Sequence, residues 1–332
     1  MIITRTPFRI SFFGGGTDYP AYYEHNGGGA VLSASIDKFC YISSRYLPPF
    51  FKHKHKIVWS KLETVNDINK IKHHSARETL RYIGHEKGVE IHHDGDLPAM
   101  SGLGSSSAFT VGLVHALAGL KGQLKSKREL ALNAIHIEQN MIKENIGSQD
   151  QVIVSFGGLN RINFGGPQKF EVHPIVIRQN RRDEFENHLM LFFTDFTRQA
   201  SKIAKEWIKK TPQKYRELQT MKAMVNEATD IISNDSRNLE DFGKLLHENW
   251  LIKKNLNAKI TNPKIDEIYD AGRKAGALGG KLLGAGGGGF MLFFARPSDQ
   301  PKIKQKLKHL LHVSFKFDDL GSQMIYYGNE VN

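Results

Sequence analysis

The chain is poor in cysteine and has no long apolar run. Its 332 residues include a single cysteine, Cys40, which excludes an internal disulfide and is expected to be a small core residue on a strand at 39–42. No hydrophobic stretch approaches the roughly 20 residues of a membrane span, and the N-terminus lacks the charged and then apolar layout of a signal peptide. Internal repeats and low-complexity linkers are also missing. These absences favour a globular protein of the reducing cytoplasm.

Length and composition allow two domains. The chain is 40% hydrophobic, enough for one large or two moderate cores, and two domains suit its length better. Charged and amide residues dominate between two apolar runs at 174–186, which predicts a boundary there. We therefore expect an N-terminal domain at 1–180 and a C-terminal domain at 181–332 that share an interface.

One segment combines a flexible turn, three hydroxyls and a helix start. It reads L-P-A-M-S-G-L-G-S-S-S-A over residues 97–108. Gly102 and Gly104 allow backbone conformations closed to other residues, and the serines offer hydroxyl and capping groups. From Phe109 apolar residues recur at three-and-four spacing, which predicts a helix whose first N–H groups face the serines. Such a junction favours phosphate; a loop that only caps an ordinary helix is the simpler alternative.

Two further glycine-rich segments lie near the ends of the chain. The first, T-P-F-R-I-S-F-F-G-G-G-T-D-Y-P at 6–20, alternates like a strand with one buried face before its three glycines. The second, K-L-L-G-A-G-G-G-G-F at 281–290, contains a G-x-G-x-x-G dinucleotide fingerprint. That fingerprint needs a helix after it, whereas residues 290–295 read as a strand. The pattern argues against a dehydrogenase and predicts a strand, a glycine loop and a second strand.

These three segments, in this order, resemble the three motifs of the GHMP kinases, small-molecule kinases named for galactose, homoserine, mevalonate and phosphomevalonate. The resemblance implies an α+β protein with the GHMP kinase fold: an N-terminal domain like ribosomal protein S5 domain 2, a ferredoxin-like C-terminal domain and an active site between them. It also implies ATP and Mg²⁺ as cofactors. The residues implied to bind ATP are Pro98, Ser101, Gly102, Leu103, Gly104, Ser105, Ser106 and Ser107.

A carboxylate on an apolar helix face is the candidate metal ligand. In the helix predicted at 129–145, Glu138 falls on the apolar stripe, where a carboxylate is costly unless it meets a cation. A structural salt bridge to a lysine or arginine is one explanation. The resemblance implies instead a magnesium site formed by Glu138 and Ser106, which suits an ion that takes few protein oxygens besides phosphates and water.

The candidate general base follows in G-S-Q-D-Q at 147–151, where Asp150 lies in a predicted loop. A loop aspartate is ordinarily a cap or turn former, but this segment resembles the element that carries the catalytic aspartate of galactokinase-like members. Arg9 stands where those enzymes place a positive residue beside that aspartate. The resemblance therefore implies that Asp150 is the base and that Arg9 keeps it ionised and assists the phosphoryl group. A strand-end salt bridge is the alternative for Arg9.

The first and third motifs imply where the acceptor binds. Residues 17–19 read T-D-Y, as in galactokinases, whose aspartate holds sugar hydroxyls, but three glycines replace the G-E-H that precedes it there. A threonine-to-arginine turn at 194–201, after a predicted strand at 189–193, adds an arginine. The residues implied to bind substrate are Gly16, Thr17, Asp18, Arg198, Gly284, Ala285, Gly286 and Gly287.

Within the family, the segments at 14–18, 35–38 and 58–65 resemble the heptose 7-phosphate kinases, which phosphorylate an anomeric hydroxyl. We therefore expect transfer from ATP to C1 of D-glycero-D-manno-heptose 7-phosphate. Another sugar 1-kinase, of the galactose or fucose type, is the alternative. A regulator that binds ATP and sugar without catalysis is a third possibility, which the complete set of implied catalytic and metal residues disfavours.

An excess of basic residues raises a different function. Lysine and arginine number 46 against 34 aspartates and glutamates, a formal net charge of +12. Nucleic-acid binding would suit this charge, with basic runs at 52–56, 70–81 and 302–312. No recognition-helix or stacking-aromatic signature accompanies them, and the last run alternates with apolar residues like the solvated face of a packed helix. We expect ATP and a sugar or sugar phosphate as partners, without nucleic acid or membrane, in a monomer or homodimer.

Overall fold

The computed structural model describes residues 1–85, 87–194 and 214–328, which form two layered parts, each built on a β-sheet. The first part contains, in chain order, β1 (Ile2–Phe13), α1 (Pro20–Tyr23), β2 (Gly29–Tyr46), β3 (His55–Val58), β4 (Leu62–Val65), η1 (Ile68–Lys70), α2 (His74–Ile83), β5 (Val89–Gly95), α3 (Ser105–Leu120), α4 (Lys127–Ile135), η2 (His136–Met141), α5 (Gln149–Phe156), β6 (Leu159–Phe164) and β7 (Phe170–Pro174). The second contains α6 (Gln179–Asn187), β8 (Leu189–Phe193), α8 (Tyr215–Ser233), α9 (Glu240–Lys254), α10 (Pro263–Lys274), β9 (Gly279–Leu282), β10 (Phe290–Phe294), α11 (Gln300–Lys306) and β11 (Leu311–Val313), and it is followed by β12 (Gln323–Tyr327).

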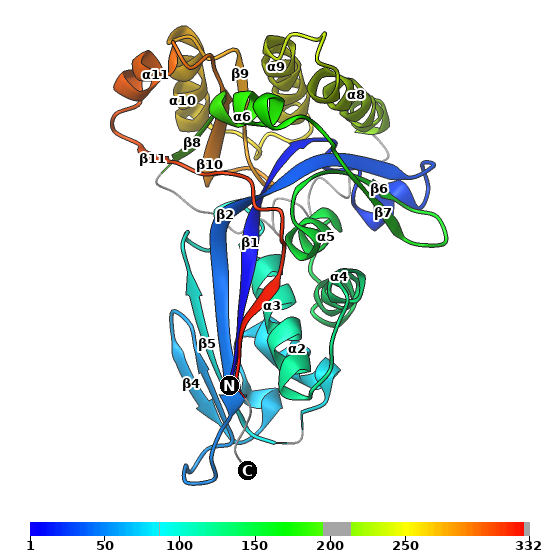
Figure 1. The fold of residues 1–332 in the computed structure, drawn as a ribbon, viewed down its shortest axis with the longest axis vertical. Coiled ribbons are helices and arrows are strands. Elements are labelled where there is room, and N and C mark those ends of the chain that lie inside the picture. Colours follow the sequence, from blue (N-terminus) through cyan, green and yellow to red (C-terminus); the bar gives the residue numbers. More distant parts are fainter. Residues whose placement is uncertain (86, 195–213, 329–332) are drawn as a thin grey trace.

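Two long antiparallel strands, β1 and β2, form the centre of the first sheet (Figure 1). The strand order is β12-β1-β2-β5-β3-β4, and β6 with β7 extends the sheet from residues 29–34 of β2. β3 and β5 run parallel, whereas the pairs made by β1 and β2 are antiparallel. Because β12 pairs with β1, the strand at 323–327 lies in the N-terminal sheet, apart from the rest of the predicted domain at 181–332.

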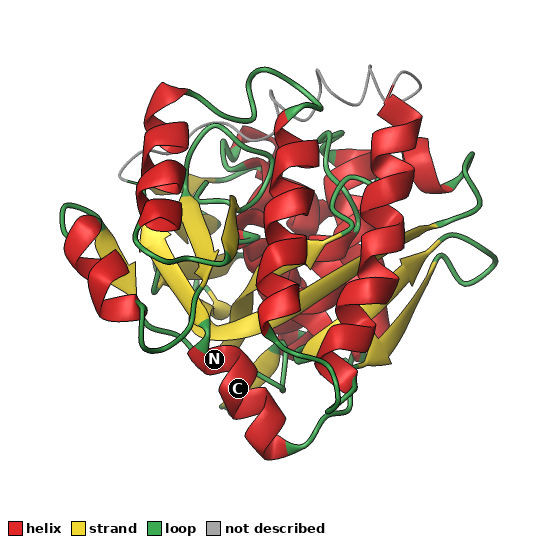
Figure 2. Ribbon diagram, turned by 90° about the horizontal axis from the view of Figure 1, so that it is seen from above, coloured by secondary structure: helices red, strands yellow, loops and turns green. Residues whose placement is uncertain are grey.

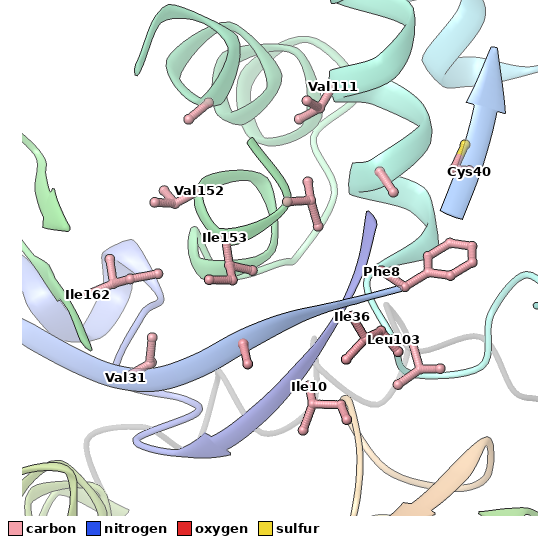
Figure 3. Packing of buried hydrophobic residues seen from close by; sticks show 14 of the residues in the cluster. Phe8, Ile10, Val31, Ile36, Cys40, Leu103, Val111, Val152, Ile153 and Ile162 are labelled. Atoms are coloured by element: carbon pink, nitrogen blue, oxygen red, sulfur yellow. The ribbon is translucent and has the colours of Figure 1, made fainter. Parts of the chain in front are cut away.

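Helix α3 organises the core of the first part. Every residue from 107 to 119 is buried, because the helix is apolar around its whole circumference and packs against β1 and β2 as well as α2, α4 and α5. Figure 3 shows Phe8 and Ile10 of β1 in one cluster with Val111 of α3 and Ile153 of α5. Cys40 lies in the same cluster at 1% exposure, which confirms it as a small core residue. Because α3 is buried on all sides, its N-terminus is held in place. The segment at 97–107, called the serine loop below, leads into this N-terminus.

The start of α3 differs from the prediction. The helix begins at Ser105 rather than at Phe109, so the serines form its first turn instead of a loop before it. Gly104 makes this possible, because it takes a left-handed φ of 76° at the N-cap position. The polar residues of this turn gave no apolar periodicity from which the earlier start was predictable.

Two other predicted helices are shorter than expected. The helix predicted at 129–145 is α4 continued by the π-helical η2, and residues 142–145 are not helical. The helix predicted at 302–312 ends with α11 at Lys306, and residues 311–313 pair with β8 as the edge strand β11. In this second case the open edge of β8 determines the conformation, which local periodicity does not reveal.

The second sheet has the order β11-β8-β10-β9 and is antiparallel throughout. It confirms the strand at Leu189–Phe193 and the predicted strand, glycine loop and strand of the third motif, which are β9, residues 283–289 and β10. Figure 2, seen from above, shows helices lying over the strands of this half. Trp250 of α9 and Phe293 of β10 lie in the core between them. None of the helices in the described part of the chain has the length and apolar character needed to cross a membrane.

Candidate active site

The three glycine-rich segments meet around a cavity of about 480 Å³. The serine loop and the third-motif loop touch through their backbones. A Cβ atom added to Gly102 would lie 2.6 Å from the carbonyl oxygen of Leu283, and one added to Gly284 would lie 2.6 Å from the Cα atom of Gly102. Both glycines also have left-handed φ angles, 83° and 71°. Glycine is therefore required at both positions, and the contact places two segments that are distant in sequence at one wall of the cavity.

The serine loop presents the N-terminus of α3 to the cavity. Backbone N–H groups of a first helical turn have no intrahelical acceptor, and together with the helix dipole they attract an anion. Five of the residues predicted to bind ATP line the cavity: Gly102, Gly104, Ser105, Ser106 and Ser107. Three do not line it, because Pro98 is exposed elsewhere and Ser101 and Leu103 are buried in the protein.

Arg9 and Asp150 form the ion pair that the sequence predicted. The Arg9 guanidinium donates from Nε to Asp150 Oδ1 at 2.8 Å and from Nη2 to Oδ2 at 2.7 Å. Its Nη1 donates to the carbonyl oxygen of Gly102 at 2.6 Å, which ties the pair to the serine loop. Asp150 lies in the first turn of α5 and not in a loop, because its segment begins a helix at Gln149. Both residues line the cavity.

Asp18 is a second buried carboxylate that lines the same cavity. Its Oδ1 accepts from the backbone N–H of Gly16 at 2.8 Å, and its Oδ2 accepts from that of Gln149 at 3.3 Å. Burial raises the pKa of Asp18 to about 6, and the nearby charge of Asp150 adds to this effect. Gly147 packs directly on the carboxylate, since a Cβ there would lie 1.8 Å from Oδ2.

The other predicted substrate residues divide into two groups. Gly16, Gly284 and Ala285 line the cavity with Asp18. Thr17 does not: its hydroxyl donates to the carbonyl oxygens of Gly14 and Ala30, so its side chain supports the turn. Gly286 and Gly287 do not line the cavity, and Arg198 lies outside the described residues.

Glu138 lies fully buried behind the serine loop. Its carboxylate accepts from Ser107 Oγ at 2.9 Å, from Thr110 Oγ1 at 2.7 Å and from Gln151 Nε2. Burial raises the pKa of Glu138 to about 7, and the charge of Glu144 contributes. No lysine or arginine within residues 1–85, 87–194 and 214–328 pairs with it, so the salt bridge considered from the sequence is not formed there.

One contact of Glu138 adds a residue that the sequence did not predict for the metal site. Ser107, and not Ser106, donates its hydroxyl to Glu138, whereas Ser106 is exposed and lines the cavity. The π-helical turn η2 carries Glu138. Because a π turn adds a residue to the helical repeat, it rotates the following side chains relative to a continuous α-helix.

Two lysines of the cavity were not predicted from the sequence. Lys281 of β9 and Lys253 of α9 both line it, and Lys281 is only 2% exposed. A signal existed for Lys281, which is the charged residue of the otherwise buried apolar strand G-G-K-L. None existed for Lys253, which stands beside Lys254 in a helix end where basic residues are common.

Comparisons with known proteins identify one family in both parts of the chain. The chain matches the model described as GHMP kinases N terminal domain at residues 69–158 and the model described as GHMP kinases C terminal at residues 221–312. It is 28% identical to a D-glycero-alpha-D-manno-heptose 7-phosphate kinase from Campylobacter jejuni, over 92% of this chain and 93% of that protein.

Two solved structures share the fold. The structure of a D-glycero-D-manno-heptose 1-phosphate kinase from Bacteroides thetaiotaomicron superimposes with a TM-score of 0.79 at 22% identity, covering 98% of this chain and 100% of that one. That of a putative sugar kinase from Campylobacter jejuni has a TM-score of 0.70 at 27% identity and covers 97% of both chains.

Proposed function

The chain belongs to the GHMP kinase family, and on this premise we propose that it transfers the γ-phosphoryl group of ATP to the anomeric hydroxyl of D-glycero-D-manno-heptose 7-phosphate. Membership makes it an ATP-dependent sugar kinase; the particular sugar and the position of transfer are the proposal. The observation that carries the mechanism is the Arg9–Asp150 pair, held beside the helix N-terminus that attracts phosphate and in the same cavity as Asp18.

Asp150 is proposed to act as the base. As the acceptor oxygen bonds to the γ-phosphorus, its O–H bond breaks and the proton moves to the Asp150 carboxylate, while the bond from the γ-phosphorus to the bridging oxygen breaks and ADP leaves. Such transition states are loose and highly charged, so catalysis consists mainly of positioning and electrostatic stabilisation. Arg9 serves both needs because its two bonds fix the carboxylate and its charge lies next to the transferring group.

Asp18 is proposed to hold the sugar. The carboxylate already accepts two backbone N–H groups, and a carboxylate has further lone pairs to accept sugar hydroxyls. Its neighbour Ser11 lines the same cavity, and among the described residues its hydroxyl has no hydrogen-bond partner. The side near Asp18 is thus rich in polar groups that suit a polyol.

The donor set near Glu138 fits a magnesium ion. A fully buried carboxylate with a pKa raised by burial is a group that a cation stabilises, and hydroxyls and water complete the oxygen shell that Mg²⁺ prefers. Glu138 with the Ser106 and Ser107 hydroxyls would hold the ion, which when bound would neutralise charge on the triphosphate. Without it, Ser107 and Thr110 keep the Glu138 carboxylate oriented.

The heptose is supported by the extended similarity to a heptose 7-phosphate kinase and by Lys253 and Lys281, two lysines of the cavity that form no ion pair within the described residues. A sugar panel tests this choice. With ATP and Mg²⁺, release of ADP is measured for heptose 7-phosphate, heptose without phosphate, galactose and fucose. We expect the first to have the highest kcat/KM. Faster turnover of galactose or fucose would reassign the enzyme to those sugar 1-kinases.

A further inference from the structure

Two lysines of the cavity, Lys253 and Lys281, form no ion pair with a carboxylate in the part of the chain that the structure describes. Lys281 Nζ donates to the carbonyl oxygen of Phe12 at 2.7 Å, and Lys253 Nζ donates to those of Leu282 at 2.9 Å and Gly284 at 2.7 Å. Within the described ranges, no aspartate or glutamate forms an ion pair with either lysine. Carbonyl oxygens satisfy some N–H donors but carry no net charge, so both cations remain uncompensated.

Hydrogen-bonding capacity is also left over. Each ammonium has three N–H donors. Lys281 uses one and Lys253 uses two, so three donors are available to a ligand. Burial lowers the pKa of Lys253 to about 7 and that of Lys281 well below its ordinary value, and the positive charge of Arg9 contributes at both. A bound anion would stabilise the charged form of both lysines and raise their pKa values again. A purely structural role would not require this charge.

The two lysines are anchored at different parts of the cavity wall, Lys281 at β1 and Lys253 at the third-motif loop. Phe12, which anchors Lys281, is near the end of β1, where the chain enters the turn that carries Asp18. In the described part of the chain, neither lysine donates to the first turn of α3, where the N–H groups expected to meet the triphosphate lie. Ser11 and Gln149 also line this cavity, each buried to at least nine-tenths, and among the described residues Ser11 Oγ and Gln149 Oε1 have no hydrogen-bond partner.

We propose that Lys253 and Lys281 form an anion subsite that binds the phosphate group already carried by the sugar acceptor. The inference rests on the proposed function and names its substrate class, a sugar phosphate. A phosphate monoester offers three acceptor oxygens and up to two negative charges, which match three free donors on two cations. Charge-assisted hydrogen bonds of this kind are about twice as strong as neutral ones.

The test compares the same sugar with and without its phosphate. Heptose 7-phosphate and unphosphorylated heptose are titrated by calorimetry into the nucleotide-free wild type, Lys281→Met and Lys253→Met, and ATP is titrated separately. Methionine keeps the length of the side chain and removes the charge. Lys254→Met is the matched control. It removes the same charge one residue from Lys253, but Lys254 pairs with Asp266 at 3.0 Å and does not line the cavity.

We expect the wild type and Lys254→Met to bind heptose 7-phosphate at least about 10-fold more tightly than heptose. Each cavity variant should lose most of this preference while its affinity for ATP changes less than about threefold. The proposal is overturned if the wild type shows no preference, or if the cavity variants lose ATP affinity as strongly as sugar-phosphate affinity, which would assign the lysines to the triphosphate.

Failure of the proposed function would look different. If the wild type transfers no phosphoryl group to either sugar but keeps a preference that both cavity variants abolish, the anion subsite stands and the heptose kinase activity falls. Should Lys281→Met fail to fold, as judged by thermal unfolding, Lys253→Met decides the outcome alone, since Lys253 is the less buried of the two.

Discussion

Charged side chains buried around the cavity concentrate the chemistry of the molecule in a few residues. Arg9 is 4% exposed and forms three hydrogen bonds, two to Asp150 and one to Gly102. A bidentate pair of this kind restrains both the position and the plane of the carboxylate. Glu138 and Asp18, by contrast, are held by hydroxyl, amide and backbone donors without a cation among the described residues, and burial raises the pKa of each.

The role of Asp150 leads to a first prediction. Asp150→Asn retains the shape of the side chain and removes its capacity to accept a proton. General-base catalysis contributes about 10²- to 10⁴-fold, so kcat should fall by that factor. Affinity for ATP should remain within about threefold, because the serine loop is unchanged. Steady-state kinetics and calorimetric titration of ATP measure both; turnover of the variant within fivefold of wild type would rule out Asp150 as the base.

The raised pKa of Glu138 gives a second prediction, for stability without Mg²⁺ or ATP. The folded-state pKa of about 7 lies above the ordinary 4.5, so the native state binds the proton more tightly than the unfolded state. Stability from this proton is full below about pH 4.5 and is lost as the pH rises through 7, by at most about 3 kcal/mol. Glu138→Gln has no carboxyl proton to lose, so its free energy of unfolding should increase relative to that of the wild type as the pH rises.

Urea unfolding of both proteins at pH 5 and pH 8 measures the effect. The difference in unfolding free energy between Glu138→Gln and wild type should shift in favour of the variant by about 1–3 kcal/mol at the higher pH. Asp18 titrates in a similar range but is present in both proteins, so its effect cancels. A difference that is the same at both pH values would mean that Glu138 is already ionised at pH 5. Turnover should nonetheless be lost in the variant if this carboxylate holds the metal.

At the scale of elements, loop contacts assemble the site. The serine loop and the third-motif loop come from different sheets and meet at Gly102 and Gly284. Sequence patterns predicted β10, which is a short apolar run closed by Arg296 and Pro297, and the resemblance of the third motif implied the strand before its loop. They did not predict the contact between loops, since close approach of two backbones leaves no trace in periodicity.

This loop contact yields a third prediction. In Gly284→Ala the added methyl group would lie 2.6 Å from Gly102 Cα, so the loops must separate. We expect kcat/KM to fall by at least about tenfold, because a displacement of about 1 Å in a catalytic site is enough to reduce the rate strongly. Gly166→Ala is the control: its φ of 73° imposes a similar backbone strain, but nothing lies within 4 Å of its Cβ. Equal losses of activity in both variants would show that strain, and not the contact, is responsible.

The elements that carry functional residues were predicted unevenly. The strand of Arg9 was recognised by its alternation, and the pairing with Asp150 by resemblance to the family. The helical position of Asp150 and the π turn under Glu138 were not, because both depend on how helices pack around α3. Lys253 gave no signal at all, since only tertiary structure distinguishes it from Lys254, which pairs with Asp266 and does not line the cavity.

At the scale of the whole molecule, the cavity draws its lining from both parts. β1 supplies Arg9, α5 supplies Asp150, and the second part supplies Lys253, Lys281 and the third-motif loop. The return of β12 to the first sheet ties the end of the second part back to β1. Neither long-range arrangement follows from composition or local pattern, because strand pairing across such separations is a property of the folded chain.

Ligands that bind between the two parts should therefore stabilise the molecule as a whole. We expect the thermal unfolding midpoint to rise with ATP and Mg²⁺, and to rise further when heptose 7-phosphate is added to Asp150→Asn, in which turnover is too slow to consume the ligands during the measurement. The free-energy gain follows RT ln(1 + [L]/Kd), about 2.7 kcal/mol at a hundredfold excess over Kd. Absence of the second increment at saturating sugar phosphate would place the sugar outside this cavity.

The central claim is transfer of phosphate to the anomeric hydroxyl, and phosphorus NMR tests it most directly. The protein is incubated with ATP, Mg²⁺ and D-glycero-D-manno-heptose 7-phosphate, with Asp150→Asn as the parallel sample. We expect a new phosphate signal coupled to the anomeric proton, growing in step with ADP in the wild type and at least about 100-fold more slowly in the variant. ADP accompanied only by inorganic phosphate, or no reaction while ATP is bound, would contradict it.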